Sequence, residues 1–208
     1  MFLLESGNAL AKFSLPEKIM TCAFQSVTCR TAGFNTLPLT DLSPATLFLF
    51  MFLMFVGGSP GSTAGGIKTT SFAMLVLLIS SRLSGRARPE IFGRTIARKD
   101  MERILMLLLV ALLLIVGSVF LLLVTERGSE YGKANENGFL AIFFEVVSAL
   151  GTVGLSMGIT PCLTEMGKTI VIVLMFVGRI GPLTLAIFLT GITEELDYDY
   201  PEEKVMIG

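Results

Sequence analysis

The sequence predicts an all-α, polytopic membrane protein. Of its 208 residues, 52% are hydrophobic and only 16% are charged, whereas a soluble domain has about 25% charged residues. Residues 104–124 are uncharged and almost wholly apolar. A helix of that length spans roughly 30 Å, the thickness of a bilayer core. The net charge of −1 gives no bulk attraction to nucleic acid, so no nucleic-acid partner is expected.

A second observation is an internal repeat. Residues 24–35 and 144–156 both end in Thr, a small residue, Gly and an apolar residue, and each segment is followed by an apolar helix. Those helices share the sequence Met-Phe-Val-Gly, at 54–57 and 175–178. Both pairs of motifs are 121 positions apart. A repeat in register over two motifs indicates a duplicated structural unit.

The first unit begins with residues 1–11, which resemble the end of a helix. Ser14-Leu15-Pro16-Glu17 is a helix start, with a capping hydroxyl, a proline in the first turn and an acid at the positive end of the helix. The helix that it begins, at about 16–29, is too short to cross a bilayer. It is therefore predicted to be interfacial or re-entrant.

Ser43-Pro44 begins the next helix, which is apolar over 45–56. Ten residues rich in Gly and Ser, 57–66, interrupt it before an apolar pattern resumes at 67–81. Such a break at membrane depth leaves backbone groups without partners. It is tolerated only where it packs inside protein or lines a water-filled path.

The second unit is complete and its direction follows from charge. Residues 84–103 are rich in Arg and Lys, so this loop is predicted to be cytoplasmic. The remaining predicted segments are an outward helix (104–124), an external loop (125–137), a short re-entrant helix (138–150), an inward helix (166–190) and a cytoplasmic tail (191–208).

The two Thr-small-Gly segments suggest cation selectivity. Thr-Val-Gly at 152–154 is also the start of the potassium-channel filter sequence, in which backbone carbonyls replace the hydration shell of K+. Gly reaches the backbone angles that aim successive carbonyls at one axis, and Thr adds a hydroxyl. The candidate K+ ligands, through their carbonyls, are Thr31, Ala32, Gly33 and Phe34 (the first filter loop) and Thr152, Val153, Gly154 and Leu155 (the second filter loop). Substituting Gly33 or Gly154 by Ser is expected to weaken discrimination of K+ from Na+.

The sequence therefore divides into helix–pore-loop–helix units. Residues 1–83 form one unit that lacks most of its first helix, and residues 104–190 form a whole one. Residues 84–103 are the basic cytoplasmic loop between them, and 191–208 are the C-terminal tail.

The Gly-rich break is a candidate gate, an interpretation that rests on a family resemblance. It comprises Gly57, Gly58, Ser59, Pro60, Gly61, Ser62, Thr63, Ala64, Gly65 and Gly66. A static packed kink is one alternative, and a nucleotide-binding P-loop is another, because Gly61 and Gly66 have Walker A spacing. That motif requires Lys directly after the second Gly, whereas Ile67 precedes Lys68 here.

Two cationic side chains need an explanation: Lys68 lies just after this break, and Arg179 lies in the last apolar helix. Arg179 in the middle of an apolar helix costs at least about 2.5 kcal/mol on insertion, so it should face the interior or the pore. There it would limit K+ occupancy, tether the gate loop by its carbonyls, or form a buried pair with Glu145. Lys68 either lies at the cytoplasmic end of the gate loop or extends its amine towards water.

Together these motifs resemble the Trk/Ktr/HKT superfamily of potassium transporters. The matching segments are 29–35, 56–69, 151–156 and 176–182, and the tail 200–208 is most similar to the KtrB/NtpJ branch. The resemblance implies four helix–pore–helix repeats around one pore, of which this chain supplies the third and fourth. It implies Na+-coupled or Na+-stimulated K+ uptake across a bacterial plasma membrane.

The resemblance also implies partners. They are membrane lipid, a second copy of the membrane subunit, and a cytosolic nucleotide-binding regulatory subunit of the RCK type, similar to KtrA. No covalently bound cofactor is expected. Enzymatic activity is not expected either, since the sequence has no His and no paired membrane carboxylates. Two alternatives remain: a truncated remnant that folds without conducting, and two such chains that together supply four filter loops.

Overall fold

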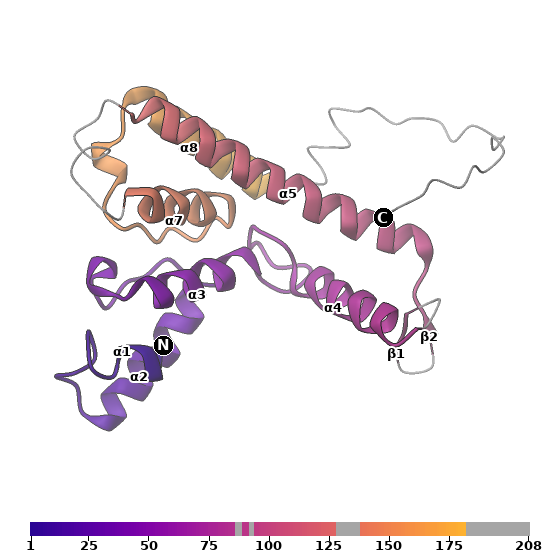
Figure 1. The fold of residues 1–208 in the computed structure, drawn as a ribbon, viewed down its shortest axis with the longest axis horizontal. Coiled ribbons are helices and arrows are strands. Elements are labelled where there is room, and N and C mark those ends of the chain that lie inside the picture. Colours follow the sequence, from indigo (N-terminus) through magenta and orange to yellow (C-terminus); the bar gives the residue numbers. More distant parts are fainter. Residues whose placement is uncertain (86–88, 92–93, 128–137, 182–208) are drawn as a thin grey trace.

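The computed structural model describes residues 1–85, 89–91, 94–127 and 138–181. The helices are α1 (Phe2–Glu5), α2 (Leu15–Thr28), α3 (Pro44–Phe55), α4 (Thr69–Leu83), α5 (Arg98–Thr125), α7 (Gly138–Leu150) and α8 (Glu165–Ile180). Short 3₁₀ turns lie at Leu39–Asp41 and Thr160–Cys162. A two-stranded antiparallel hairpin, β1 (Glu90–Ile91) and β2 (Arg94–Thr95), joins α4 to α5 (Figure 1).

Most helix ends lie within two residues of their predicted positions, but the start of α5 differs. α5 begins at Arg98 rather than at 104, because charged residues extend a helix beyond its apolar run. α8 runs to Ile180, and Gly181 follows with a φ of 94°; positions 182–190 of the predicted helix lie outside the described residues. The predicted tail 191–208 and most of loop 125–137 lie outside the described residues, and the sidedness of the chain stays a prediction.

Among the described helices, α5 is long and apolar enough to cross a membrane, over Asp100–Thr125. The helices α3, α4 and α7 are apolar but shorter. α5 and α8 lie side by side, with α7 packed beneath them, and α3 contacts α7 from the opposite side (Figure 1). α4 continues from α3 beyond the 57–66 loop, so this loop lies near the centre of the molecule (Figure 1).

The repeat extends well beyond the two filter motifs. The two 3₁₀ turns are 121 positions apart, the same separation as the filter motifs. A pair of buried carboxylates follows the same rule, at Glu5 and Glu126. Each of these structural features recurs in both units, which supports the duplicated arrangement inferred from sequence.

Each of these carboxylates caps the helix that follows its filter loop. Glu5 accepts hydrogen bonds from the Ser43 N–H (2.9 Å), the Ser43 hydroxyl (2.5 Å) and the Thr46 hydroxyl (2.5 Å), at the start of α3. Glu126 accepts from the N–H (3.0 Å) and the hydroxyl (2.6 Å) of Thr164, at the start of α8. A negative charge is favourable at this end of a helix. We call these two contacts the carboxylate caps; they join the end of α1 to the start of α3 and the end of α5 to the start of α8.

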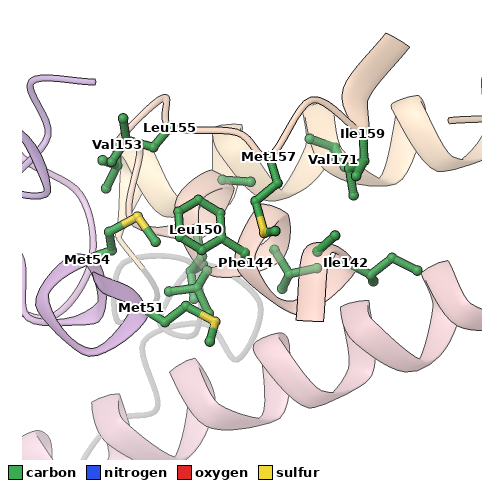
Figure 2. Close-up of a cluster of buried hydrophobic side chains, with 14 of the residues drawn as sticks. Met51, Met54, Ile142, Phe144, Leu150, Val153, Leu155, Met157, Ile159 and Val171 are labelled. Atoms are coloured by element: carbon green, nitrogen blue, oxygen red, sulfur yellow. The ribbon is translucent and has the colours of Figure 1, made fainter. Parts of the chain in front are cut away.

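The core is built around α7. Nine of its thirteen residues are buried, and Phe144 is fully enclosed. Met51 and Met54 of α3 pack against it on one side, and Val171 of α8 lies in the same cluster (Figure 2). The second filter loop belongs to this cluster too, through residues 153 and 155. The end of α7 and the loop that follows it are therefore held by surrounding packing.

The equivalent helix of the first unit has a different environment. In α2 only Gln25 and Thr28 are buried, both of them polar. Its apolar side chains at 15, 19, 20, 24 and 27 are exposed. The two units thus share a chain path, but only the second unit surrounds its short helix within the described chain.

Close backbone contact between α7 and α8 depends on Gly178. A Cβ added there would overlap the carbonyl oxygen of Leu150, and small residues are what allow membrane helices to approach this closely. We therefore expect Gly178→Ala to lower the stability of the purified protein by about 1–3 kcal/mol, measured by thermal unfolding in detergent. Gly117→Ala in α5 is the matched control, because its Cβ would meet nothing within 4 Å. Equal unfolding temperatures for the two variants would contradict the packing argument.

Candidate functional site

Both filter loops have the same unusual backbone conformation. Thr31 and Thr152 have φ angles of 65° and 51°, and they are the non-glycine residues with positive φ in the described chain. Gly33 and Gly154, two positions later, have φ angles of 74° and 91°. A β-branched residue in the left-handed region is a true outlier, and such strain persists where the surroundings impose it, often at functional sites. In both loops the two residues with positive φ are thus separated by one residue whose φ is not positive.

The backbone N–H groups of these loops bond to the ends of the preceding helices. Ala32 and Gly33 donate to the Thr28 carbonyl, each at 3.2 Å, and Val153 donates to the Ser148 carbonyl at 2.9 Å. The loops are thus anchored through their donors, which leaves carbonyls available to a ligand. Phe34 is a partial exception, because its carbonyl accepts the Thr28 hydroxyl at 2.6 Å.

The structure brings the two filter loops together. A Cβ added at Gly33 would overlap the carbonyl oxygen of Val153, and one at Gly154 would lie 3.8 Å from the Gly33 Cα. Segments that are about 120 positions apart in sequence therefore adjoin at their glycines, as expected if both contribute to one site.

The two ends of loop 57–66 lie side by side, and we call this junction the neck of the loop. Val56 and Ile67 form an isolated parallel bridge. At this neck the Gly57 N–H donates to the Ile67 carbonyl at 2.8 Å, and the Thr69 N–H donates to the Gly58 carbonyl at 3.1 Å. The two ends of the loop are fixed, while its tip at 59–63 is exposed.

Two cations hold three consecutive carbonyls of this loop. Lys68 Nζ donates to the carbonyls of Ser62 (3.0 Å) and Ala64 (2.6 Å). Arg179 Nη1 donates to the carbonyl of Thr63 at 2.6 Å. Of the interpretations of Arg179 given above, this contact agrees with a tether on the loop. Lys68 likewise folds onto the loop instead of extending its amine away from it.

The structure gives Arg179 and Glu145 different hydrogen-bond partners from the pairing that was one alternative above. The Glu145 carboxylate accepts the hydroxyl of Ser156 at 2.7 Å and that of Thr160 at 2.5 Å. Arg179 and Glu145 both line a cavity of about 410 Å³ beside the second filter loop, which also includes Thr152. They share this space, but the hydrogen bonds of Glu145 go to the filter side.

The loop also touches the second filter loop directly. The Gly65 N–H donates to the Thr152 hydroxyl oxygen at 3.1 Å. A Cβ at Gly65 would lie 2.6 Å from that oxygen and 2.9 Å from the Gly151 carbonyl. Sequence reasoning did not find this contact, because its partners are 87 positions apart. The loop thus lies against the Thr end of the second filter loop.

The arrangement does not fit the P-loop alternative. The loop follows helix α3 instead of a strand, and Lys68 is occupied by carbonyls of the loop itself. In the described part of the chain, no group of three or more His, Cys, Asp or Glu residues could hold a metal ion.

Comparison with known proteins agrees with this geometry. The family described as "TrkH: Cation transport protein" matches residues 1–195. The chain belongs to this family. The match confirms the resemblance to potassium transporters of the Trk and Ktr type that was inferred from the motifs.

Several TrkH-family relatives cover the entire chain. It is 42% identical to the potassium/sodium uptake protein NtpJ of Enterococcus hirae, over 100% of this chain and 46% of that protein. It is 39% identical to the Ktr system potassium uptake protein D of Bacillus subtilis, over 100% of this chain and 44% of that protein. The chain thus spans a little under half the length of these relatives.

A solved structure confirms the fold class. The chain is similar to the potassium transporter TrkH from Vibrio parahaemolyticus, with a TM-score of 0.72 and 25% identity. The match covers 90% of this chain and 40% of that one. An all-α membrane fold of helix–pore-loop–helix repeats is therefore shown for this TrkH-family chain.

The contact between loop 57–66 and the second filter loop can be tested by removing its acceptor. Thr152→Val keeps the shape of the side chain but leaves the Gly65 N–H unpaired, which costs about 1–3 kcal/mol for a buried donor. We expect faster hydrogen exchange at Gly65 and faster proteolysis at 59–63. Thr152→Ser retains the oxygen and is the control. Identical exchange in both variants would show that the contact does not hold the loop.

Proposed function

We propose that this chain forms part of a K+-selective pore and takes part in K+ uptake across a bacterial plasma membrane. The observation that carries the proposal is the shared conformation of the two filter loops, with positive φ at Thr31 and Gly33 and again at Thr152 and Gly154. Selectivity for a dehydrated cation requires rings of carbonyl oxygens at ion-sized spacing. Two adjoining loops supply part of such a ring. Further filter segments would come from the rest of a protein of the relatives' length.

The short helices support the same conclusion. α2 and α7 each end directly before a filter loop, so the negative ends of two helix dipoles face the place where the cation would lie. The hydroxyls of Thr31 and Thr152 add oxygen at the same end. Nothing in this arrangement requires an enzymatic step.

We also propose that loop 57–66 is the gate. Its neck is fixed by the bridge between Val56 and Ile67, and its middle is held by Lys68 and Arg179. Gly65 and Gly66 place its last part against the second filter loop. A loop with fixed ends and a middle held by a few polar contacts can move without disturbing the helices that carry it.

Coupling and partners follow from relatives and charge. The name of the E. hirae relative includes both potassium and sodium, which supports Na+ dependence. We propose that residues 84–103 are cytoplasmic and contact a nucleotide-binding regulatory subunit of the RCK type. A homodimeric membrane assembly in lipid completes the proposal.

Selectivity is the direct test of the filter. Gly154→Ser and Gly33→Ser force a side chain into left-handed backbone, so both should reduce the ratio of K+ to Na+ flux in membrane vesicles. Gly33→Ser should be the more damaging, because its Cβ also overlaps the Val153 carbonyl, whereas the site at Gly154 is more open. Unchanged selectivity in both variants would rule out the filter. A protein that inserts normally but passes no rubidium would support the non-conducting alternative.

Loss of the loop tethers should open the gate. Arg179→Gln removes a hydrogen bond from a charged donor, worth about 1.5–3 kcal/mol, and should raise rubidium flux by roughly tenfold if the loop limits flux. Deleting 59–63 should raise flux further and weaken regulation. Lys168→Gln, which removes an exposed cation of the same helix, is the control. Wild-type flux and regulation in the deletion variant would exclude the gate.

A further inference from the structure

We propose that Glu145 is a positioning residue that sets the geometry of the second filter loop and thereby its ion selectivity. The proposal rests on the proposed function, because it assumes that residues 152–155 contact the ion. Glu145 lies in α7 behind this loop and is 4% exposed. Its carboxylate is placed to act on the loop through the two hydroxyls that bond to it.

Glu145 joins α7 to two residues that follow the filter loop, and we call this pair of hydrogen bonds a bracket. One carboxylate oxygen accepts the Ser156 hydroxyl and the other accepts the Thr160 hydroxyl. Ser156 lies two positions after Gly154, and its oxygen also accepts the Gly158 N–H at 3.0 Å. The segment that leaves the filter loop is therefore fixed to the helix that enters it. Movement of Glu145 would be transmitted to Gly154 through Ser156 and Leu155.

The first unit has a similar bracket with a neutral residue, which lies one position away from the equivalent of Glu145 in the 121-residue repeat. Gln25 in α2 is fully buried, and its Nε2 lies 3.3 Å from Asn35 Oδ1 and 3.2 Å from Thr36 Oγ1. Asn35 lies two positions after Gly33, just as Ser156 follows Gly154. Gln25 also lies three positions before Thr28, and Glu145 lies three positions before Ser148, the residues whose carbonyls anchor the two filter loops.

The two brackets differ in strength. Hydrogen bonds that involve a charged group are shorter and roughly twice as strong as neutral ones. The bonds to Glu145 are 2.5 and 2.7 Å, against 3.2 and 3.3 Å for Gln25. The carboxylate oxygens of Glu145 both accept, whereas an amide at this position would offer one acceptor and one donor. The second filter loop is thus the more rigidly held of the two.

The test is ion selectivity in the full-length membrane protein, measured as the ratio of K+ to Na+ flux in vesicles. Glu145→Gln preserves shape but cannot accept both hydroxyl protons on separate oxygens. We expect the ratio to fall by about twofold to thirtyfold, the range in which such networks affect a neighbouring site. Ser156→Ala and Thr160→Val should each shift the ratio in the same direction by less. These two variants also test the proposal if Glu145→Gln does not reach the membrane.

Two controls separate this proposal from the one on which it rests. Glu165→Gln removes an exposed carboxylate at the start of α8 and should leave the ratio unchanged. If Gly154→Ser alters selectivity while Glu145→Gln, Ser156→Ala and Thr160→Val retain the wild-type ratio, Glu145 is only a packing residue and the inference is overturned. If Gly154→Ser also retains the wild-type ratio, the filter assignment fails as well.

Discussion

The fold depends on one junction of backbone at the C-terminal end of α7. Four segments approach residues 150–153 with little or no side chain between them: Met54 of α3, Gly65 of loop 57–66, Gly178 of α8 and Gly33 of the first filter loop. Backbone groups can meet this closely only where a Cβ is absent. The same meeting point holds the second filter loop, the last residues of loop 57–66 and the crossing of α7 with α8.

The units share a chain path, but their support differs. α7 is enclosed by α3, α5 and α8, whereas the apolar face of α2 is open within the described chain. The polar brackets behind the two filter loops differ in the same sense, neutral at Gln25 and charged at Glu145. Duplication therefore preserved the backbone of the site, while burial and charge diverged around it.

The sequence predicted most of the helices for physical reasons that are local, whereas the filter loops as an ion site stay a prediction. Ser14, Pro16, Ser43 and Pro44 mark helix starts by capping, which acts within a few residues. The start of α5 was missed because hydropathy records the apolar part of a helix and not its charged first turn. The positive φ at Thr31 and Thr152 could not be foreseen either, since intrinsic preference disfavours it and only the surrounding packing imposes it.

Contacts between distant segments left weaker signals. The hydrogen bond from Gly65 to Thr152 has no local signature. The carboxylate caps did have one, because Glu5 and Ser43 are 38 residues apart and so are Glu126 and Thr164. That equal spacing could have been read from the repeat once its period was known.

These caps have a mechanical consequence. Each cap joins two residues that are 38 positions apart and so closes a ring in the chain. Each ring contains a short helix and its filter loop. Sliding of α3 along α1, or of α8 along α5, would separate a buried carboxylate from its hydrogen-bond donors, which is costly. Any displacement is therefore expected beyond each ring, where loop 57–66 follows α3 and Gly181 follows α8.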